Sequence, residues 1–327
     1  MESTRTQERH AELLRRSPRN PLLTARDWPY PVNTVFNPGA IRLPSGETLL
    51  LVRCEDRRGI SHLTVARSKD GVNDWQIDPE PTLAPDPINH PESVWGLEDP
   101  RVVWVEEMER YVVTYTTFSR GGPGVAMCTT RDFRTFDRRG MIMAPEDKDS
   151  ALFPRRFDGR WLLIHRPVPS AGRAHIWVSW SPDLRHWGDH SILLERRHGA
   201  WWDALKVGLA GPPIETPEGW LIMYHGVRST ASGALYRVGL ALVDLENPLK
   251  VLLRGDEYIM GPEQDYEMIG DVGGVVFPCG HTVGDDGDTL NIYYGAADTS
   301  VCLATGSISE MLNWLKAHGR PGGLPFD

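Results

Sequence analysis

The sequence predicts an all-β fold, a five-bladed β-propeller with a short helical extension at its N-terminus. Three observations support this prediction. From Asn37 onward the chain consists of short apolar runs, rich in β-branched and aromatic residues, that are separated by turns. An aspartate-centred turn recurs with a period of about 60 residues. The 32 glycines, 26 prolines and 12 tryptophans among 327 residues suit a fold with many turns and aromatic packing.

The first element along the chain is a polar segment without a strand pattern. Its periodicity and composition predict a short helix over residues 8–16. We expect residues 1–20 to form an extension and residues 21–327 to form a single propeller catalytic domain, because closed all-β folds of this length often form one domain. Since the extension has no expected place in a blade, one hypothesis is that it packs on a neighbouring subunit of a homo-oligomer.

The first strands expected in the propeller form a hairpin. The apolar runs 40–43 and 48–53 flank a turn at residues 44–47 that contains Pro44 and Gly46, which is typical of a hairpin. Apolar strands that follow a Gly- or Asp-containing turn return further along the chain. These later strands are residues 111–116, 161–165, 220–225 and 290–295.

A repeat underlies these strands. In each of three copies, Ser or Thr lies two residues before an aspartate, and an aromatic residue follows the aspartate; a fourth copy is degenerate. The repeated aspartates are Asp70, Asp132, Asp183 and Asp244, which are 62, 51 and 61 residues apart. The roughly 290 residues after Asn37 then correspond to about five units, each long enough for a four-stranded blade. The alternative is a β-sandwich in which the aspartate turns recur by chance.

Composition excludes several classes of function. The formal net charge of −9 argues against nucleic acid as a main partner. No apolar run is long enough to span a membrane, and the charged N-terminus does not resemble a secretory signal, so we expect a cytoplasmic protein. The 4 cysteines are scattered and the histidines show no ligand spacing, which predicts reduced thiols and gives no support for a metal site. The sequence contains no GxSxG motif, no Walker loop and no GxGxxG motif after a strand, so we expect no bound cofactor.

A pair of adjacent carboxylates is the first candidate for catalysis. Glu98 and Asp99 lie between Gly96 and Pro100, directly before an apolar strand. A carboxyl group at the mouth of a propeller channel, with its pKa adjusted by partial burial, can act as a general acid. The alternative is a structural Asp-Pro turn in which Glu98 pairs with Arg101.

A second candidate site consists of cationic and polar residues where apolar strands end. Buried strands that terminate in long charged side chains need an anionic partner, so this set suits phosphate, sulfate or a substrate carboxylate. The alternative is that each residue forms an internal salt bridge with one of the 44 acidic residues. The set contains Arg53, Arg58, His165, Arg166, Lys206, His225 and Tyr236. Aromatic residues that suit either sugar stacking or blade packing are Trp95, Phe118, Trp201, Trp202 and Tyr294.

Many short segments, in order, resemble glycoside hydrolase family 130, the mannoside phosphorylases and their relatives. The resemblance extends from about residue 20 to residue 298. The segments that carry it are residues 37–40, 51–53, 55–57, 96–101, 148–154, 165–167, 181–184, 186–188, 206–208, 211–214, 219–220, 224–226, 266–267 and 293–298. The family fold is a five-bladed propeller, in agreement with the repeat.

The resemblance implies an inverting phosphorolysis of β-mannosides that releases α-mannose 1-phosphate. It implies that Asp99 is the general acid and that its proton travels through the 3-hydroxyl group of the bound mannosyl unit. The implied phosphate-binding residues are Arg166, Lys206, His225 and Tyr236, with Arg53 or Arg58 as a further arginine. The implied sugar-binding residues are Asn37, Glu98, Arg101, Asp149 and Asp298.

Such a site needs only one catalytic carboxyl group. An inverting hydrolase uses a second carboxylate to activate water, whereas phosphate is already an anionic nucleophile and needs cations to bind and align it. The expected ligands are therefore a β-mannoside and inorganic phosphate as co-substrate. Two alternatives remain, a β-mannoside hydrolase on the same scaffold and a non-catalytic sugar-binding propeller. The segment 201–205 before Lys206 departs from the pattern of many relatives, which affects the detail of the phosphate loop.

Overall fold

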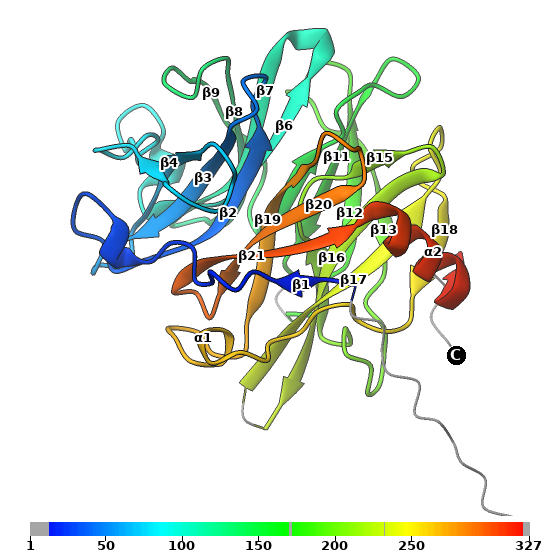
Figure 1. The fold of residues 1–327 in the computed structure, drawn as a ribbon. Helices are drawn as coiled ribbons and strands as arrows, with labels where there is room; N and C mark the ends of the chain where they lie inside the picture. The colour runs from blue at the N-terminus through cyan, green and yellow to red at the C-terminus, as the bar shows by residue number, and fades with distance from the viewer. Residues whose placement is uncertain (1–12, 170–171, 232, 323–327) are drawn as a thin grey trace, which may run out of the picture.

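The computed structural model describes residues 13–169, 172–231 and 233–322. Within them the chain is nearly all β, as predicted (Figure 1). The helical elements are α1 (Asp265–Met268), α2 (Ile308–His318) and the single 3₁₀ turns η1 (Ala25–Asp27), η2 (Pro91–Ser93) and η3 (Glu106–Met108). Neither α-helix in this described part of the chain has the length and apolar composition needed to cross a membrane.

The largest sheet consists of two successive antiparallel groups of strands. The first group is β2 (Thr34–Arg42), β3 (Thr48–Glu55), β4 (Ser61–Ser68) and β5 (Gln76–Ile77). The second group is β6 (Gly96–Val105), β7 (Arg110–Ser119), β8 (Gly122–Thr130) and β9 (Asp137–Met143). A single parallel bridge, Ser61 with Gly96, joins them. The two groups are therefore separate units that share one point of contact in the strand ladder.

Three further groups follow along the described chain. The third is β10 (Asp147–Leu152), β11 (Trp161–Pro167), β12 (Ile176–Ser181) and β13 (Gly188–Leu194). The fourth is β14 (Lys206–Leu209), β15 (Ile214–Thr216), β16 (Gly219–Thr230), β17 (Gly233–Val243) and β18 (Val251–Gly255), with β22 (Gly319–Pro321) at its edge. The fifth is β19 (Val276–Val283), β20 (Thr289–Ala296) and β21 (Ser300–Ser307), completed by β1 (Arg15–Arg16).

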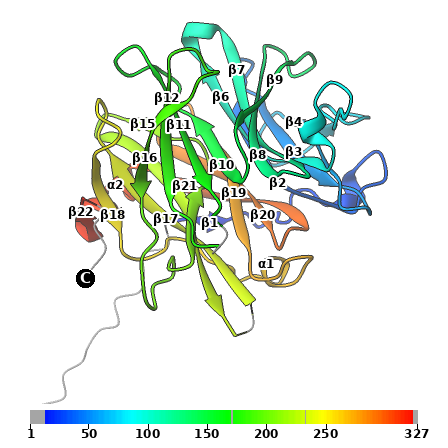
Figure 2. The same cartoon turned by 180° about the vertical axis from the view of Figure 1, so that it is seen from behind.

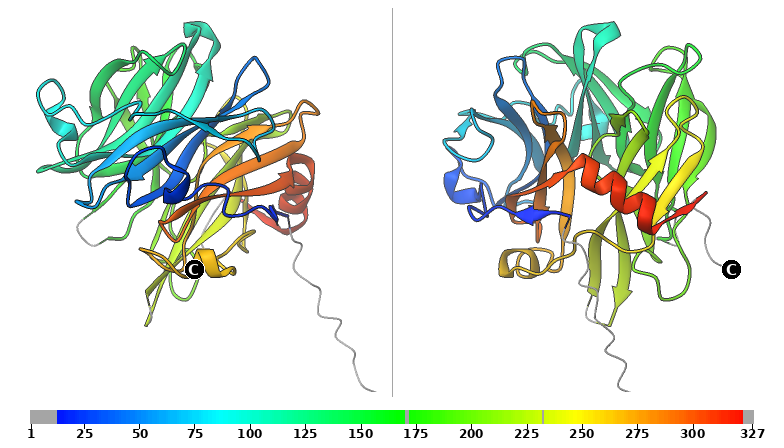
Figure 3. Two further views of the ribbon diagram at one scale, coloured as in Figure 1. Left: turned by 60° about the vertical axis from the view of Figure 1, so that its left-hand side comes forward. Right: turned by 45° about the vertical axis from the view of Figure 1, so that its right-hand side comes forward.

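The first strands of the groups meet one another. β2 contacts both β6 and β19, and β10 contacts both β6 and β14. Figure 2 shows the second and third groups side by side, in agreement with contacts of β10 with β7 and β8. Helix α2 lies across the fourth and fifth groups, where it contacts β17, β18, β21 and β22 (Figure 3). Residues on the first strands are thus brought together from distant parts of the sequence.

Bulges interrupt several of these first strands at equivalent places. The strand register shifts between Phe36 and Gly39 in β2, and similar shifts occur in β6, β10 and β19. At three of the bulges, Asn37, Asp99 and Asp149 adopt positive φ angles of 46°, 49° and 54°. Asn and Asp tolerate this conformation better than other non-glycine residues. Because a bulge turns a side chain away from the regular alternation, it can direct these polar groups to the centre.

The aspartate repeat corresponds to a recurring turn. Asp70, Asp132, Asp183 and Asp244 each accept hydrogen bonds from the backbone N–H groups two and three residues further on. Each of these turns connects the third and fourth strands in the hydrogen-bonded order of its group, in which β15 of the fourth group lies off the main path. The repeat predicted from the sequence is therefore confirmed as a repeat of local structure.

The N-terminal segment differs from the prediction. Residues 8–12 of the predicted helix lie outside the described residues, but residues 15 and 16 form strand β1, which pairs with β21 at Thr305 and Ala304. Leu13 and Leu14 are buried. Arg16 donates to both carboxylate oxygens of Glu267, at 2.8 and 3.0 Å. Pairing and burial outweigh a weak helical preference here, so the predicted helix is wrong at its end, and the segment has a place in the fifth group.

All four cysteines lie within the described residues, where each is buried and free. This agrees with the prediction of reduced thiols. Buried apolar side chains form several clusters between neighbouring groups rather than one central core. The centre, where the first strands meet, is occupied by polar and charged side chains instead, including buried Asp99, Arg101, Asp149 and Arg166.

Candidate active site

The polar residues at the centre divide into two clusters. The first, here called the carboxylate cluster, contains Asn37, Arg53, Glu55, Glu98, Asp99 and Asp298. The second, the cationic cluster, contains Lys148, Asp149, Arg166, Lys206, His225 and Tyr236. The site therefore offers one acidic region and one region of positive charge.

Asp99 is the buried member of the carboxylate cluster, with 5% of its surface exposed. Its Oδ1 accepts two hydrogen bonds, from Asn37 Nδ2 at 2.9 Å and from Arg53 Nη1 at 3.1 Å. No hydrogen bond from another described residue reaches Oδ2. Burial raises the pKa of Asp99, but Arg53, Arg101 and the Asn37 hydrogen bond outweigh it and hold the pKa below its ordinary value. Oδ2 is thus the oxygen on which a transferable proton can reside.

The guanidinium group of Arg53 is already paired with carboxylate groups of the protein. Its Nη2 lies 3.1 Å from Glu55 and 3.2 Å from Glu98, while its Nε donates to Ser61 Oγ at 3.0 Å. The neighbouring carboxylates raise the pKa of Arg53 despite its burial. The structure therefore places Arg53 with the predicted sugar-binding residues and apart from the other predicted phosphate-binding residues.

Asp298 behaves differently from the other carboxylates. It follows β20 in a left-handed conformation, with φ 51°. Burial raises the pKa of Asp298 to about 7 against the lowering effect of Arg53, and repulsion from Asp99, Glu55 and Glu98 adds to the rise. Near neutral pH this carboxyl group is partly protonated, so the cluster carries less negative charge than its composition suggests.

Asp149 organises the cationic cluster. Its Oδ2 accepts a hydrogen bond from Arg166 Nε at 2.7 Å and lies 3.4 Å from Nε2 of His225. Its Oδ1 is buried and accepts no hydrogen bond within the described structure. Burial raises the pKa of Asp149, but Arg166, then His225 and Arg101, outweigh it and hold the pKa well below its usual range. The ionised carboxylate of Asp149 is therefore in direct contact with residues of the cationic cluster.

Several hydrogen-bond donors of the cationic cluster have no acceptor among the described residues. The ammonium groups of Lys148 and Lys206 form no hydrogen bond or ion pair with any described residue, and both ring nitrogens of His225 lack a hydrogen-bond partner there. Lys206 Nζ lies 5.2 Å from the centre of the Tyr236 ring. Burial and Arg166 lower the pKa of Lys206, and burial lowers the pKa of His225 to about 3. Donors without partners, on buried His225 and on the half-buried lysines Lys148 and Lys206, are suited to binding an anion.

Arg101 lies between the two clusters and donates hydrogen bonds to backbone carbonyl groups. It donates to the carbonyl oxygens of Asp99 at 2.9 Å, Leu209 at 2.8 Å and Ala210 at 3.0 Å. Its Nη2 lies 3.6 Å from Asp149. Arg101 thus ties β6 to the end of β14, and three of its five N–H donors are already used within the protein.

The structure separates Arg58 from the site and assigns two of the aromatic candidates to packing. Arg58 lies on the exposed turn after β3, where it pairs with Asp56 at 2.7 Å, and no contact joins it to the cationic cluster. Of the aromatic candidates, Trp202 and Tyr294 are buried packing residues, whereas Trp95 is 42% exposed. Arg58 was predicted as a cationic residue near the end of an apolar strand and as an alternative to Arg53 in the family resemblance, and neither reason specifies the direction of its side chain.

Two residues of the site were not predicted from the sequence. Glu55 shares Arg53 with Glu98, and Lys148 lies opposite Arg166 in the register of β10 and β11. A signal for Lys148 existed in the sequence, because it directly precedes Asp149 in a segment already identified as a candidate. Glu55 likewise belongs to a segment that carries the resemblance, residues 55–57, but only the folded hairpin brings it beside Ser61.

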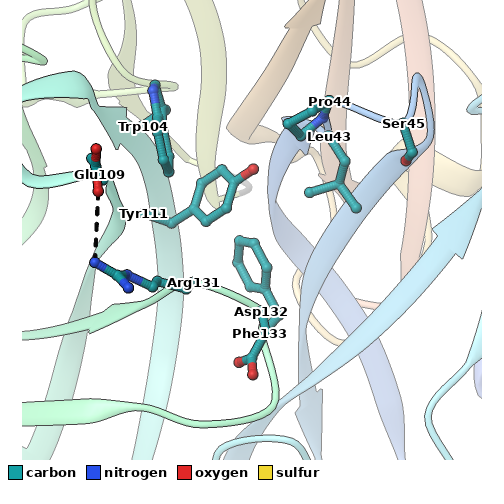
Figure 4. Close-up of a pocket in the computed structure, with 9 residues that line it drawn as sticks. All are labelled: Leu43, Pro44, Ser45, Trp104, Glu109, Tyr111, Arg131, Asp132 and Phe133. Atoms are coloured by element: carbon teal, nitrogen blue, oxygen red, sulfur yellow. Dashed lines mark ion pairs between the residues drawn. The ribbon is translucent and has the colours of Figure 1, made fainter.

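A separate surface hollow lies away from both clusters (Figure 4). The residues that line it are Leu43, Pro44, Ser45, Trp104, Glu109, Tyr111, Arg131, Asp132 and Phe133. They come from the ends of β2 and β6 opposite to Asn37 and Asp99, from the turn between β6 and β7 with the start of β7, and from the turn after β8. Arg131 and Glu109, the ion pair in the figure, are 3.8 Å apart. None of the candidate catalytic or binding residues lines this hollow. No group of side chains suited to a metal ion occurs among the described residues.

Comparison with known proteins places the chain among mannoside phosphorylases. The family described as beta-1,4-mannooligosaccharide phosphorylase, Glyco_hydro_130, matches residues 10–317. The chain is 41% identical to the beta-1,2-mannobiose phosphorylase of Listeria innocua over 262 residues, which cover 80% of this chain and 70% of that protein. It is 33% identical to the beta-1,4-mannooligosaccharide phosphorylase of Ruminococcus albus over 306 residues, which cover 91% and 90%.

A solved structure is similar over nearly the whole chain. It is a beta-1,2-mannobiose phosphorylase from Listeria innocua in complex with beta-1,2-mannobiose. The match has a TM-score of 0.84 and 33% identity, and it covers 93% of this chain and 99% of that one. The similarity therefore includes the first strands that carry both clusters.

Proposed function

The chain belongs to glycoside hydrolase family 130, the mannoside phosphorylases and their relatives, and on this basis we propose that it catalyses the inverting phosphorolysis of β-mannosides to α-mannose 1-phosphate. The observation that carries the proposal is the presence of one buried carboxyl group, Asp99, and of a separate cluster in which Arg166 lies with two ammonium groups, of Lys148 and Lys206, that have no hydrogen bond or ion pair to a described residue. An inverting hydrolase needs a second carboxylate to activate water. A phosphorylase needs positive charge in that position, because its nucleophile is itself an anion.

The two clusters suggest a division of roles. We assign phosphate binding to Lys148, Arg166, Lys206, His225 and Tyr236. The mannosyl unit would lie against the carboxylate cluster, where Asn37, Glu98 and Asp298 are available for its hydroxyl groups. Arg53 is reassigned to this sugar side because its donors already meet carboxylates. Asp149 and Arg101 hold the cationic cluster and β14 in place.

In the proposed reaction a phosphate oxygen attacks the anomeric carbon on the face opposite to the leaving sugar. The bond from that carbon to the glycosidic oxygen breaks, and the oxygen receives a proton that originates from Asp99. Because Arg53 favours ionised Asp99, Asp99 must take up a proton before turnover. Monohydrogen phosphate brings one proton and leaves as the mannose 1-phosphate dianion, so the proton balance closes without a base. No cofactor other than inorganic phosphate is required.

For the substrate we propose β-1,2-mannobiose first and β-1,4-mannobiose second. The relative with 41% identity acts on β-1,2-mannobiose, and the relative with 33% identity acts on β-1,4-mannooligosaccharides. Initial rates on both disaccharides under the same phosphate concentration would rank them. A faster reaction with β-1,4-mannobiose would reverse this order without affecting the phosphorylase assignment.

The test of the reaction is an incubation of the enzyme with each disaccharide, with and without phosphate. Mannose 1-phosphate that forms only with phosphate is the expected result. Free mannose released at the same rate without phosphate would establish the hydrolase alternative. Binding of the disaccharide without any turnover would favour a non-catalytic sugar-binding protein.

We also propose that the five strand groups are the blades of a five-bladed β-propeller. Contacts among β2, β6, β10, β14 and β19 support this arrangement, as does the equivalent position of the bulges on four of these strands. An experimental structure in which β14 and β19 lie on opposite sides of a sandwich would contradict it.

A further inference from the structure

A row of hydrogen-bonded side chains crosses all four strands of the third group. It begins at His190 on β13, whose Nδ1 lies 2.7 Å from Ser179 Oγ on β12. Ser179 Oγ lies 2.7 Å from Nε2 of His165 on β11, and His165 Nδ1 lies 2.6 Å from Asp147 Oδ2 on β10. The row thus extends from the outer strand of the group to its first strand.

The row is buried apart from its outer end. Asp147, His165 and Ser179 are 3%, 2% and 0% exposed, whereas His190 is exposed. His165 was a candidate for anion binding in the sequence, but both of its ring nitrogens meet Asp147 and Ser179 instead. None of the four residues has a role in the reaction as proposed above, and a buried ionisable pair needs an explanation.

The inner end of the row meets Arg166. Asp147 Oδ1 accepts the backbone N–H of Arg166 at 3.1 Å. The ladder between β10 and β11 is weak at this point, because Pro167 opposite Asp147 has no N–H and because β10 is bulged after Lys148. Arg166 is therefore held at two points, its backbone by Asp147 and its Nε by Asp149 at 2.7 Å.

We propose that Asp147 and His165 are positioning residues that fix the backbone of Arg166 and thereby its guanidinium in the anion site. The proposal rests on the proposed function, in which Arg166 binds phosphate. A misplaced guanidinium loses contacts with the anion more than contacts with the sugar, since Arg166 belongs to the cationic cluster. The row should therefore control phosphate affinity with little effect on mannoside affinity.

A consistent arrangement of protons supports this role. His190 donates from Nδ1 to Ser179, Ser179 donates to Nε2 of His165, and His165 donates from Nδ1 to Asp147. Every donor then points towards the Asp147 carboxylate, and each buried polar atom of the row has a partner. A polarised chain of this kind strengthens each hydrogen bond within it and holds the carboxylate in one orientation.

The test compares two substitutions at one position. His165→Phe removes both hydrogen bonds of the ring, whereas His165→Asn retains an N–H near the position of Nδ1 that can donate to Asp147. We expect His165→Phe to raise the KM for phosphate by about tenfold or more, as for the loss of a hydrogen bond to a charged group, with the KM for mannobiose within about twofold of wild type. His165→Asn should restore most of the phosphate affinity. His186→Asn, a change of an exposed histidine on the neighbouring turn, serves as the matched control.

Calorimetric titration of inorganic phosphate into each folded variant provides a second readout that does not need turnover. Equal phosphate affinities for wild type and His165→Phe would overturn the inference, as would equal rises in both KM values or a phenylalanine variant indistinguishable from the asparagine variant. Should wild type release mannose without phosphate, the proposed function fails, and the titration still decides whether the row controls anion binding. If His165→Phe does not fold, phosphate is titrated into Asp147→Leu, which removes the acceptor of the Arg166 N–H, and into Asp147→Asn, which retains one carboxamide oxygen for it. Weaker phosphate binding by Asp147→Leu than by Asp147→Asn supports the inference, and equal affinities overturn it.

Discussion

At the scale of single residues, the two oxygens of Asp99 are not equivalent. Oδ1 receives both hydrogen bonds, from Asn37 and Arg53, and no described residue donates to Oδ2. Donors on one oxygen stabilise charge there and leave the other oxygen to carry a proton. The asymmetry follows from the bulge on β6, which places Asp99 in a left-handed conformation beside two neighbouring strands.

Asp99→Asn should abolish phosphorolysis while the protein remains folded. An amide cannot supply the proton, and loss of a general acid reduces rates by about 10²–10⁴-fold. The measurement is kcat with mannobiose and phosphate, with the thermal unfolding curve as a check of the fold. Glu98→Gln is the companion variant, since Glu98 also pairs with Arg53, and its loss should be smaller. Unchanged turnover in Asp99→Asn would remove Asp99 from the mechanism.

Lys206→Ala should mainly raise the KM for phosphate. The Lys206 ammonium group forms no hydrogen bond or ion pair with a described residue and lies over the Tyr236 ring, so its charge is available to the anion, and loss of such a contact weakens binding by about 10–100-fold. Steady-state kinetics with phosphate varied at saturating mannobiose measures the change. Lys250→Ala, an exposed lysine in the fourth group, is the control. A KM for phosphate equal to that of wild type would contradict the assignment of Lys206.

Asp298→Asn should change how stability depends on pH. Because the pKa of Asp298 in the folded protein is raised to about 7, folding favours the protonated form. This contribution is complete below about pH 4 and is lost as the pH rises through about 7. The asparagine variant cannot lose this proton, so its Tm should rise relative to that of wild type between about pH 5 and pH 8. A constant difference in Tm over this range would show that Asp298 titrates as an ordinary carboxyl group.

The types of the site residues could be predicted from the sequence, but the hydrogen-bond and ion-pair partners of each residue could not. Asp99, Arg166, Lys206 and His225 stand at the starts or ends of apolar strands, and this position is visible in the sequence. Whether a cation is free or already paired depends on residues from other groups. Arg53 meets Glu98 and Asp99 across 45 residues of sequence or more, and that proximity exists only after two groups have docked.

At the scale of elements, two local features recur in most groups of strands. An aspartate turn joins the third and fourth strands in four of the groups, and a bulge interrupts the first strand in four of them, over the described residues. The turn was predictable because its residues form a local motif. The bulges were not, because a bulge depends on pairing between two strands and has no fixed sequence.

Arg16→Ala should destabilise the fold through β1. The substitution leaves Glu267 buried without its cation, and breaking a buried ion pair costs about 3 kcal/mol. Chemical unfolding measures the loss. Arg15→Ala is the matched control, since Arg15 is the exposed neighbour on the same strand and should have little effect. Equal stabilities of the two variants would show that the contact between Arg16 and Glu267 contributes little.

At the scale of the whole molecule, the all-β class and the unit of about 60 residues were predictable from the spacing of the aspartate turns. The role of the N-terminal segment was not predictable. Residues 13–16 contain two leucines and two arginines, a composition that suits either a helix or a strand. Pairing with another strand selects the strand over the helix, and the strand that pairs with this segment, β21, lies near the other end of the chain.

Inorganic phosphate alone should stabilise the molecule against heat. Binding to the folded state adds about 2.7 kcal/mol at a concentration of about 100 times the Kd. The Tm measured against phosphate concentration, with chloride at matched ionic strength as control, gives the effect. The same titration with Lys206→Ala should require more phosphate for the same rise in Tm. Equal rises with phosphate and chloride would contradict a specific anion site.

The pairing of β1 with β21 has a consequence for how the protein is made. Arg15 leaves the ribosome early, and its partner Thr305 follows only after nearly the whole chain has been synthesised. At ordinary rates of translation the interval is on the order of tens of seconds. During that time β1 has no partner and Glu267, once synthesised, depends on Arg16 for its counter-charge. The fifth group can therefore be completed only at the end of synthesis, whereas the first three groups consist of strands that are consecutive in the chain.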